Sequence, residues 1–173
     1  MSDGGVVLDA STILEVLNRH DVDYVVIGAW AVEAQGIRRS QPTRDIDITP
    51  SKATENLRRL SSALRDLGAR IRTPDVPDGL VFDHDATSLA RSGIWNLICP
   101  AGEFDISFTP SGFPDGYPDL AQRSVLLELA SGIRVQVAAV ADVVASKRSA
   151  GRDKDVRALP EIIDQARKLG LLD

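Results

Sequence analysis

Two carboxylates stand two residues apart in the stretch PTRDIDITP, residues 42–50. Successive side chains of a strand point to opposite faces, so Asp45 and Asp47 share one face while Ile46 and Ile48 share the other. Two like charges at this spacing repel each other unless a cation lies between them. Carboxylate oxygens are ligands that Mg²⁺ prefers, so the pattern indicates a metal site; acids on a solvated strand edge are the simpler alternative.

Two further segments point to the same chemistry. Gly28 ends the apolar run DYVVIG and precedes a helical pattern, so its backbone can approach a bound phosphate closely. The segment EFDISF places Asp105 on the strand face opposite to Phe104 and Ile106. Three strand carboxylates and a glycine turn favour phosphoryl or nucleotidyl transfer assisted by two metal ions.

Basic and aromatic residues near these segments have two interpretations each. The segment SKRSAGRDKDVR, residues 146–157, is either a phosphate-binding surface or a solvated helix face. The arginines of residues 38–44 could receive a polyphosphate or an RNA end, or could simply be solvated. Trp30 could stack a nucleotide base, whereas packing in the core is the default for tryptophan.

The elements that would position these residues follow from hydrophobic periodicity. Helices are expected over residues 9–21, from residue 28, over 51–68 and 139–151, with another beginning at Pro160. Strands are expected over 23–28, 45–50 and 69–72, and hairpins over 93–108 and 124–138, with a loop over 73–83. The order predicts an α/β (α+β) fold, a mixed sheet backed by helices with a helical C-terminus, in one domain over residues 1–173.

Composition sets outer bounds on the class of protein. The 173 residues are 43% hydrophobic and 26% charged, with a net charge of −5, as in a folded protein rather than a dedicated duplex-DNA binder. The single cysteine, Cys99, excludes an internal disulfide framework. The N-terminus lacks a signal-peptide pattern and no run is long enough to span a membrane. These features favour a cytoplasmic protein with no membrane association.

The stretch YVVIGAWAVEAQGIRRSQPTRDIDITP resembles the first motif of the nucleotidyltransferase superfamily, in particular its minimal, AbiEii-like branch of toxin–antitoxin-type enzymes. The resemblance extends to ENLRRLSSALRDLGAR, GEFDISFTPSG and ASKRSAGRDKDVRALPEI, and so covers nearly the whole chain. A glycine turn with one acidic pair would be a weak signal. The same segments in the family's order are a strong one.

The resemblance implies roles for particular residues. Asp45, Asp47 and Asp105 would hold Mg²⁺, in a two-metal site, and Asp105 would orient or deprotonate the attacking hydroxyl. With Lys147, which would contact a phosphate, these form the implied catalytic set. The nucleotide-binding set comprises Gly28, Ala29, Trp30, Thr43, Arg44, Lys147, Arg152, Lys154 and Asp155.

Two positions depart from the family pattern. Ala29 stands where a second glycine or a serine is usual, and Trp30 follows it, so a hydroxyl donor is missing. Gln41 stands where the pattern has an arginine. Arg39 or Arg44 could replace that charge without necessarily reproducing its geometry. The departures bear on nucleotide choice and rate more than on the fold.

The resemblance implies a Mg²⁺-dependent enzyme that moves a nucleoside monophosphate from an NTP to an acceptor hydroxyl. The first expectation for the acceptor is a tRNA 3′ end, with the chain acting as a toxin beside a cognate antitoxin. A small-molecule antibiotic is the second, and a protein-modifying antitoxin or a catalytically degenerate nucleotide-binding member the third. A basic rim around a wide cleft would favour tRNA, whereas a narrow pocket with additional acids would favour a cationic drug.

Overall fold

A mixed sheet of eight strands forms the centre of the molecule in the computed structural model, which describes residues 5–173. The order of strands across the sheet is β4-β3-β5-β6-β2-β1-β8-β7. The β2–β6 and β1–β8 pairs are parallel, and the other neighbouring pairs are antiparallel. The strands are β1 (Tyr24–Ile27), β2 (Asp45–Pro50), β3 (Arg70–Thr73), β4 (Val76–Leu80), β5 (Ile94–Cys99), β6 (Gly102–Ser107), β7 (Val125–Glu128) and β8 (Arg134–Val137).

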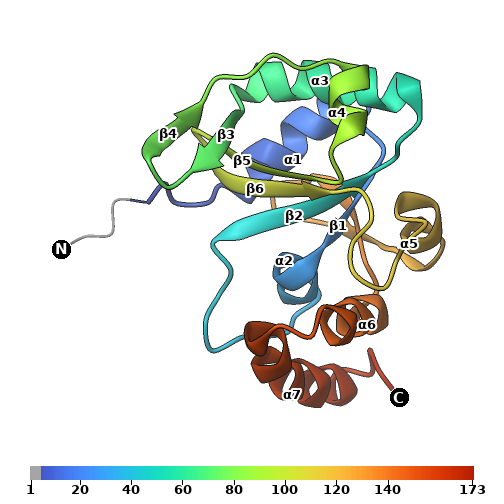
Figure 1. The fold of residues 1–173 in the computed structure, drawn as a ribbon. Helices are drawn as coiled ribbons and strands as arrows, with labels where there is room; N and C mark the ends of the chain where they lie inside the picture. The colour runs from blue at the N-terminus through green and yellow to red at the C-terminus, as the bar shows by residue number, and fades with distance from the viewer. Residues whose placement is uncertain (1–4) are drawn as a thin grey trace.

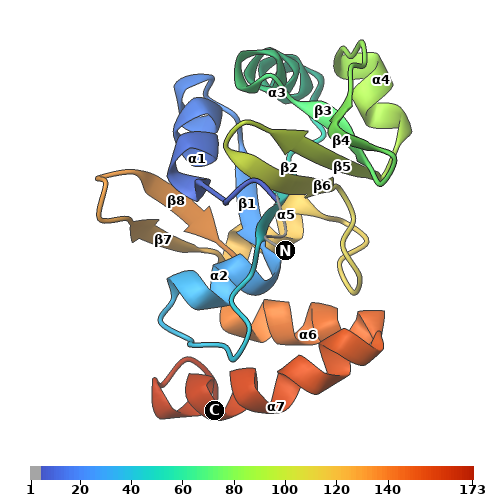
Figure 2. The same cartoon turned by 90° about the vertical axis from the view of Figure 1, so that its left-hand side faces the viewer.

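Helices cover both faces of this sheet. Figures 1 and 2 show α1, α3 and α4 on one side and α2, α6 and α7 on the other. The α/β expectation is confirmed, with a helical C-terminus after the last strand. The helices are α1 (Ala10–Arg19), α2 (Gly28–Ala34), α3 (Thr54–Leu67), α4 (Ala86–Arg91), α5 (Tyr117–Arg123), α6 (Val140–Ala150) and α7 (Asp153–Lys168).

The N-terminal helix and the long helix after β2 show why local sequence is sufficient for these elements. The Asp9 side chain caps α1 by accepting a hydrogen bond from the Thr12 backbone N–H at 3.2 Å. Leu60 and Leu64 of α3 recur four residues apart and are fully buried, which is the apolar stripe of a helix packed on a sheet. Gly68 ends α3 in the left-handed conformation, with φ of 66°.

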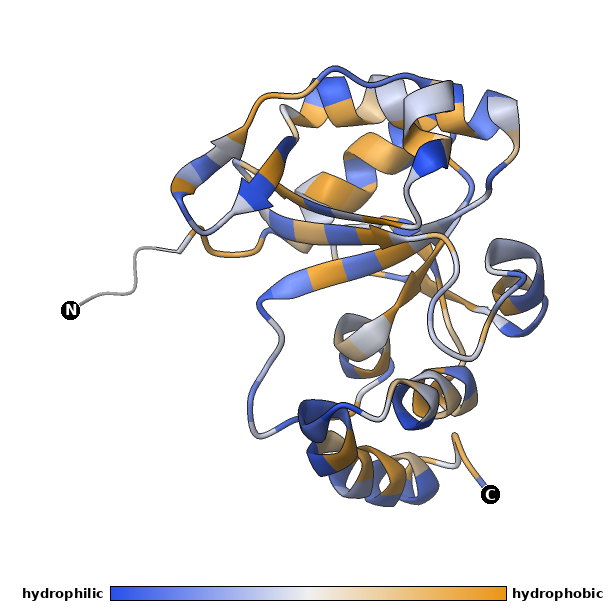
Figure 3. Cartoon of the chain, viewed as in Figure 1, coloured by the Kyte–Doolittle hydropathy of each residue, from blue (hydrophilic) through white to orange (hydrophobic). Residues whose placement is uncertain are grey.

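Strands β2 and β6 divide their side chains between two different environments. Ile46, Ile48, Phe104 and Ile106 point into the hydrophobic core and are fully buried. The intervening residues carry the carboxylates on the opposite face. Figure 3 shows the alternation as blue and orange bands along β2. The period of two read from the sequence therefore holds in the structure.

Two expectations about local structure were wrong. Residues 76–80 form strand β4, paired with β3, rather than part of a loop. Strand β4 is an edge strand, and it tolerates Pro77 because a residue on the solvent side of an edge strand needs no N–H to bond a neighbouring strand. Pro160 lies inside α7 rather than at a helix start. Burial of Ile162 and Ala166 after it stabilises the continuous helix despite the backbone hydrogen bond that proline cannot donate.

Both expected hairpins are present, as β5–β6 and β7–β8. Helices α4 and α5 were not expected. Within residues 5–173, no helix combines the length and the apolar character needed to cross a bilayer.

Candidate active site

A row of side chains crosses the sheet on the face that carries the carboxylates. Ile27 of β1 pairs with Asp47 of β2, which pairs with Asp105 of β6, which pairs with Asn96 of β5. Directly paired residues point to the same face of a sheet. The parallel β2–β6 pairing therefore brings two carboxylates together that are 58 positions apart in the sequence.

Asp45, Asp47 and Asp105 form a compact carboxylate cluster. One oxygen of each can be chosen such that all three lie within 4.8 Å of one another. Burial, followed by the charges of Asp45 and Asp105, raises the pKa of Asp47 to about 7. Burial also raises the pKa of Asp105. A hard divalent cation fits this donor set, because it would offset the repulsion that disfavours the ionised carboxylates.

Neighbouring side chains hold the outer two carboxylates in place. The Thr43 hydroxyl donates to Asp45 Oδ1 at 2.9 Å, and the Thr43 backbone N–H donates to Glu33 Oε1 at 3.0 Å. On the other side, Arg72 donates to Asp105 Oδ1 at 2.9 Å and to Glu103 Oε2 at 3.1 Å. No sequence motif indicated Arg72. It lies on the short strand β3, and strand β5 separates β3 from β6, which carries Asp105.

Gly28 lies directly against the cluster. Its φ of +69° is in the left-handed region, and a Cβ atom there would come within 2.5 Å of Asp47 Oδ2. The backbone conformation favours glycine, and a side chain there would also displace the Asp47 carboxylate. The turn predicted from the sequence thus lets the backbone pass close to the carboxylates.

A cluster of cations faces the carboxylates from helices α6 and α7 and the loop before β2. Lys147 Nζ lies 3.4 Å from Asp155 Oδ1, and Arg152 Nε donates to Asp155 Oδ2 at 2.7 Å. Burial lowers the pKa of Lys147, and the charge of Arg39 lowers it further against the opposing effect of Asp155. For Asp155, burial raises the pKa, but the contacts with Arg152 and Lys147 outweigh it and leave the pKa lowered.

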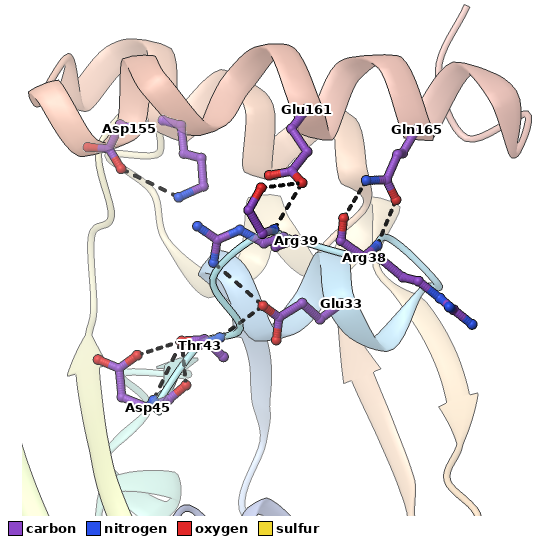
Figure 4. Close-up of polar contacts among 10 residues, drawn as sticks. Glu33, Arg38, Arg39, Thr43, Asp45, Asp155, Glu161 and Gln165 are labelled. Atoms are coloured by element: carbon purple, nitrogen blue, oxygen red, sulfur yellow. Dashed lines mark hydrogen bonds and ion pairs between the residues drawn. The ribbon is translucent and has the colours of Figure 1, made fainter. Parts of the chain in front are cut away.

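The C-terminal helix fixes the loop that carries Arg39 and Thr43 (Figure 4). Glu161 of α7 accepts hydrogen bonds from both the backbone N–H and the hydroxyl of Ser40, each at 2.9 Å. Gln165 accepts from the Arg38 backbone N–H at 2.7 Å and donates to the Arg38 carbonyl. This docking explains how a helix more than 100 positions away shapes the surroundings of the acidic strand.

Arg39 is held between this loop and the cation cluster. Its guanidinium lies 3.5 Å from Glu33 Oε1, and the side chain is only 17% exposed. Among the described residues, its buried Nε has no hydrogen-bond partner. The guanidinium therefore retains hydrogen-bonding capacity beside a second cation, Lys147.

Most of the predicted site residues meet at one cavity of about 540 Å³. Trp30 is not among the lining residues, and packs partly buried against the core. Arg44 is exposed and is also not among them. The predicted residues that line the cavity are Gly28, Ala29, Thr43, Asp45, Asp47, Asp105, Lys147, Arg152, Lys154 and Asp155.

The cavity also contains residues that sequence reasoning gave no role. Asn96 of β5 and Asp142 of α6 line it, and neither belongs to a quoted motif segment. Asn96 could have been found by assuming the hairpin register, which places it opposite Asp105. No sequence signal marked Asp142. The lining contains both cations and acids, so it is neither the basic rim expected for a tRNA acceptor nor the acid-lined pocket expected for a cationic drug.

The sequence model of the aminoglycoside-2″-adenylyltransferase family matches residues 9–145, more than three quarters of the chain. The chain belongs to this family. The enzyme class read from the sequence, nucleotidyltransferase, is therefore confirmed. The finer AbiEii-like assignment is not shown by the comparisons. The family match ends before Lys147, so the cations of α6 and α7 lie outside it.

The chain has the same fold as several solved structures of antibiotic-modifying proteins. The lincosamide antibiotic adenylyltransferase LnuA, bound to lincomycin, matches with a TM-score of 0.58 and 15% identity over 91% of this chain and 98% of its own. The antibiotic-resistance factor ANT(2″)-Ia matches with a TM-score of 0.55 and 15% identity over 90% of this chain and 80% of its own. A second structure of ANT(2″)-Ia, with adenylyl-2″-tobramycin, gives a TM-score of 0.55 at 15% identity, over 93% and 89% of the two chains. No individual curated protein sequence matches the chain.

Proposed function

We propose that this protein transfers a nucleoside monophosphate, AMP first among them, from an NTP to a hydroxyl group of a small antibiotic-like molecule. The observation that carries the proposal is the carboxylate cluster on β2 and β6 facing a cluster of cations across one cavity. A triphosphate needs cations along its length, and the reacting phosphorus needs carboxylates that can hold metal ions beside it.

The acceptor is proposed from the cavity and from what similar proteins bind. A volume of about 540 Å³ suits a small molecule. LnuA is described with lincomycin and ANT(2″)-Ia with adenylylated tobramycin, both small antibiotics. The tRNA 3′ end, the first expectation from the sequence, has no such support, nor does an antitoxin partner. The second expectation is therefore the better supported.

Asp45, Asp47 and Asp105 are the residues that would hold divalent cations such as Mg²⁺. When bound, such ions would polarise the α-phosphate, favour ionisation of the acceptor hydroxyl and offset the charge that develops on the leaving group. The donor set, three carboxylates close together and partly buried, is suited to hard cations. Thr43 and Arg72 act on it indirectly, by orienting Asp45 and Asp105.

The chain's own groups would position the two substrates for in-line displacement. Lys147, Lys154 and Arg39 would bind the phosphate oxygens, and the backbone at Gly28 lines the cavity beside Asp47. The acceptor oxygen forms a bond to the α-phosphorus, the bond from that phosphorus to the bridging oxygen breaks, and pyrophosphate leaves. Asp105 would take the proton of the acceptor hydroxyl.

The proposal is tested by transfer of label from each α-labelled NTP, with Mg²⁺, to lincomycin, tobramycin and total tRNA in parallel. The expected result is label in a small molecule, lost in Asp45→Ala. Asp75→Ala, which removes an exposed aspartate outside the cavity, should keep the label. Label in tRNA alone, or equal transfer by Asp45→Ala and the unaltered protein, would overturn the proposal.

A further inference from the structure

The two sides of the cavity differ in charge. Arg39, Lys147, Arg152 and Lys154 all lie on the side formed by α6, α7 and the loop before β2. On the other side of the carboxylate cluster, the lining comes from β5, β6 and the residue that follows Phe108 after β6. We call this second side the acceptor wall, and it comprises Ile94, Asn96, Ser107 and Thr109. Because the cations of the cavity gather on the first side, the acceptor wall is left for the hydroxyl substrate.

The acceptor wall itself carries no ionisable side chain. Beside it, Asp142 at the start of α6 lines the cavity, but its carboxylate already has a cationic partner. Arg123 Nε lies 3.1 Å from Asp142 Oδ1 and 2.9 Å from Oδ2, and the Asp142 side chain is only 10% exposed. Asp105, nearest to the wall, is paired with Arg72 and belongs to the metal-binding cluster. Among the residues described here, the wall therefore presents no carboxylate available for an ammonium group.

Apolar surface replaces charge at the mouth of the cavity. Ile94 of the acceptor wall lines the cavity and is nevertheless 59% exposed. A bound molecule with an apolar part would bury the exposed part of Ile94, which favours binding in proportion to the area covered. The remaining groups, Asn96, Ser107 and Thr109, offer hydrogen bonds to hydroxyls and amides without a net charge.

We infer that the acceptor is a hydroxyl compound with an apolar part and at most one cationic group, rather than a polycationic aminosugar. The inference rests on the proposed function. A polycation would have to desolvate several ammonium groups against a wall without matching carboxylates. No ion pair would offset the free energy that this desolvation costs. A compound with a single amine can leave that amine in solvent at the open mouth.

The test compares kcat/KM for lincomycin, which carries a single amine, with kcat/KM for tobramycin, which carries several. The unaltered protein should favour lincomycin by at least about tenfold, equivalent to about 1.4 kcal/mol. Ile94→Asp places a carboxylate on the wall and should lower the preference about tenfold or reverse it, by raising transfer to tobramycin. Leu126→Asp makes the same kind of change at a side chain that is 54% exposed on β7, outside this cavity, and should leave the ratio unchanged.

The outcomes separate this inference from the proposed function. Equal or better use of tobramycin by the unaltered protein overturns the inference while leaving a small-molecule nucleotidyltransferase. Label in neither compound overturns the proposed function and the inference together. An Ile94→Asp variant that shifts the ratio no more than Leu126→Asp also counts against the inference. If Ile94→Asp does not fold, Thr109→Asp puts the charge at another exposed position of the same wall.

Discussion

The two faces of strands β2 and β6 use alternate residues of the same short segments for opposite purposes. On one face, Ile46 and Phe104 are fully buried in the hydrophobic core. On the other, Asp47 and Asp105 are packed close enough for their charges to disfavour ionisation. The first face stabilises the fold, whereas the second holds carboxylates close together, and a bound cation would relieve their repulsion.

This difference shows why the site is built on strands rather than on loops. Main-chain pairing and the buried face hold β2 and β6 in register whatever the charged face contains. The repulsion among the carboxylates is therefore tolerated as a local cost, as is usual for functional sites. Substitutions on the two faces should separate activity from stability.

The largest expected effect is loss of activity in Asp47→Asn. Removing a carboxylate that holds metal ions takes away several kcal/mol of transition-state stabilisation, so kcat/KM should fall by about 10⁴ or more. Steady-state kinetics with the best acceptor measures this. Retention of more than a tenth of the activity would remove Asp47 from the metal site.

The same variant should be more stable than the unaltered protein when metal is absent and the pH is high. The folded pKa of Asp47 is about 7, above that of the unfolded chain, so the folded state binds more protons between about pH 4 and 7. The stabilisation present below about pH 4 is lost as the pH rises through 7. In EDTA, a plot of Tm against pH should fall less over this window for Asp47→Asn, and a parallel fall would contradict the pKa shift.

A large effect of the opposite kind is expected for Phe104→Ala on the buried face. Truncating a fully buried phenylalanine costs about 3–5 kcal/mol of unfolding free energy. Urea unfolding measures the loss, and Phe104→Leu serves as the milder variant if the alanine variant does not fold. Activity per folded molecule should stay within a few-fold, and a loss comparable to that of Asp47→Asn would show that the two faces are not separable.

A smaller effect is expected for Arg39→Gln, which tests how the opposite side of the cavity complements the carboxylate face. Loss of one phosphate contact should raise the KM for the NTP about tenfold, or about 1.4 kcal/mol, with little change in Tm. Arg38→Gln alters the neighbouring arginine, which is exposed and lies outside the cavity lining, and should leave KM unchanged. Equal effects of the two substitutions would indicate general charge rather than a positioned contact.

Elements with strong local signals were correctly predicted from the sequence. The alternation of β2, the leucine stripe of α3 and its Gly68 cap are properties of contiguous residues, so no tertiary information was needed. Strand β4 and the uninterrupted helix α7 were missed, because pairing with β3 and burial on the core outweighed the preferences of Pro77 and Pro160.

The residues of the candidate site also fall into two groups, those that the local sequence indicated and those that it did not. Asp45, Asp47 and Gly28 lie in one motif of about twenty residues, and the strand of Asp105 shows the same alternation of acidic and apolar residues. These residue types and their spacing indicated the chemistry. Arg72 and the Arg123–Asp142 pair carried no sequence signal, because each becomes relevant only through a partner distant in the chain.

The sequence by itself determined the strand periodicity that separates carboxylates from core, the turn at Gly28, and the enzyme class to which the motif belongs. Only the tertiary structure showed that Arg39 lines the cavity beside the expected cations, whereas Arg44 does not. Lys147 and Arg39 are brought together by the packing of α6 and α7 against the loop before β2. Asp142 is paired with Arg123 of α5 and is therefore not available to a ligand. The physical reason is that charge and periodicity are local properties, whereas desolvation and pairing depend on what the fold places within a few ångströms.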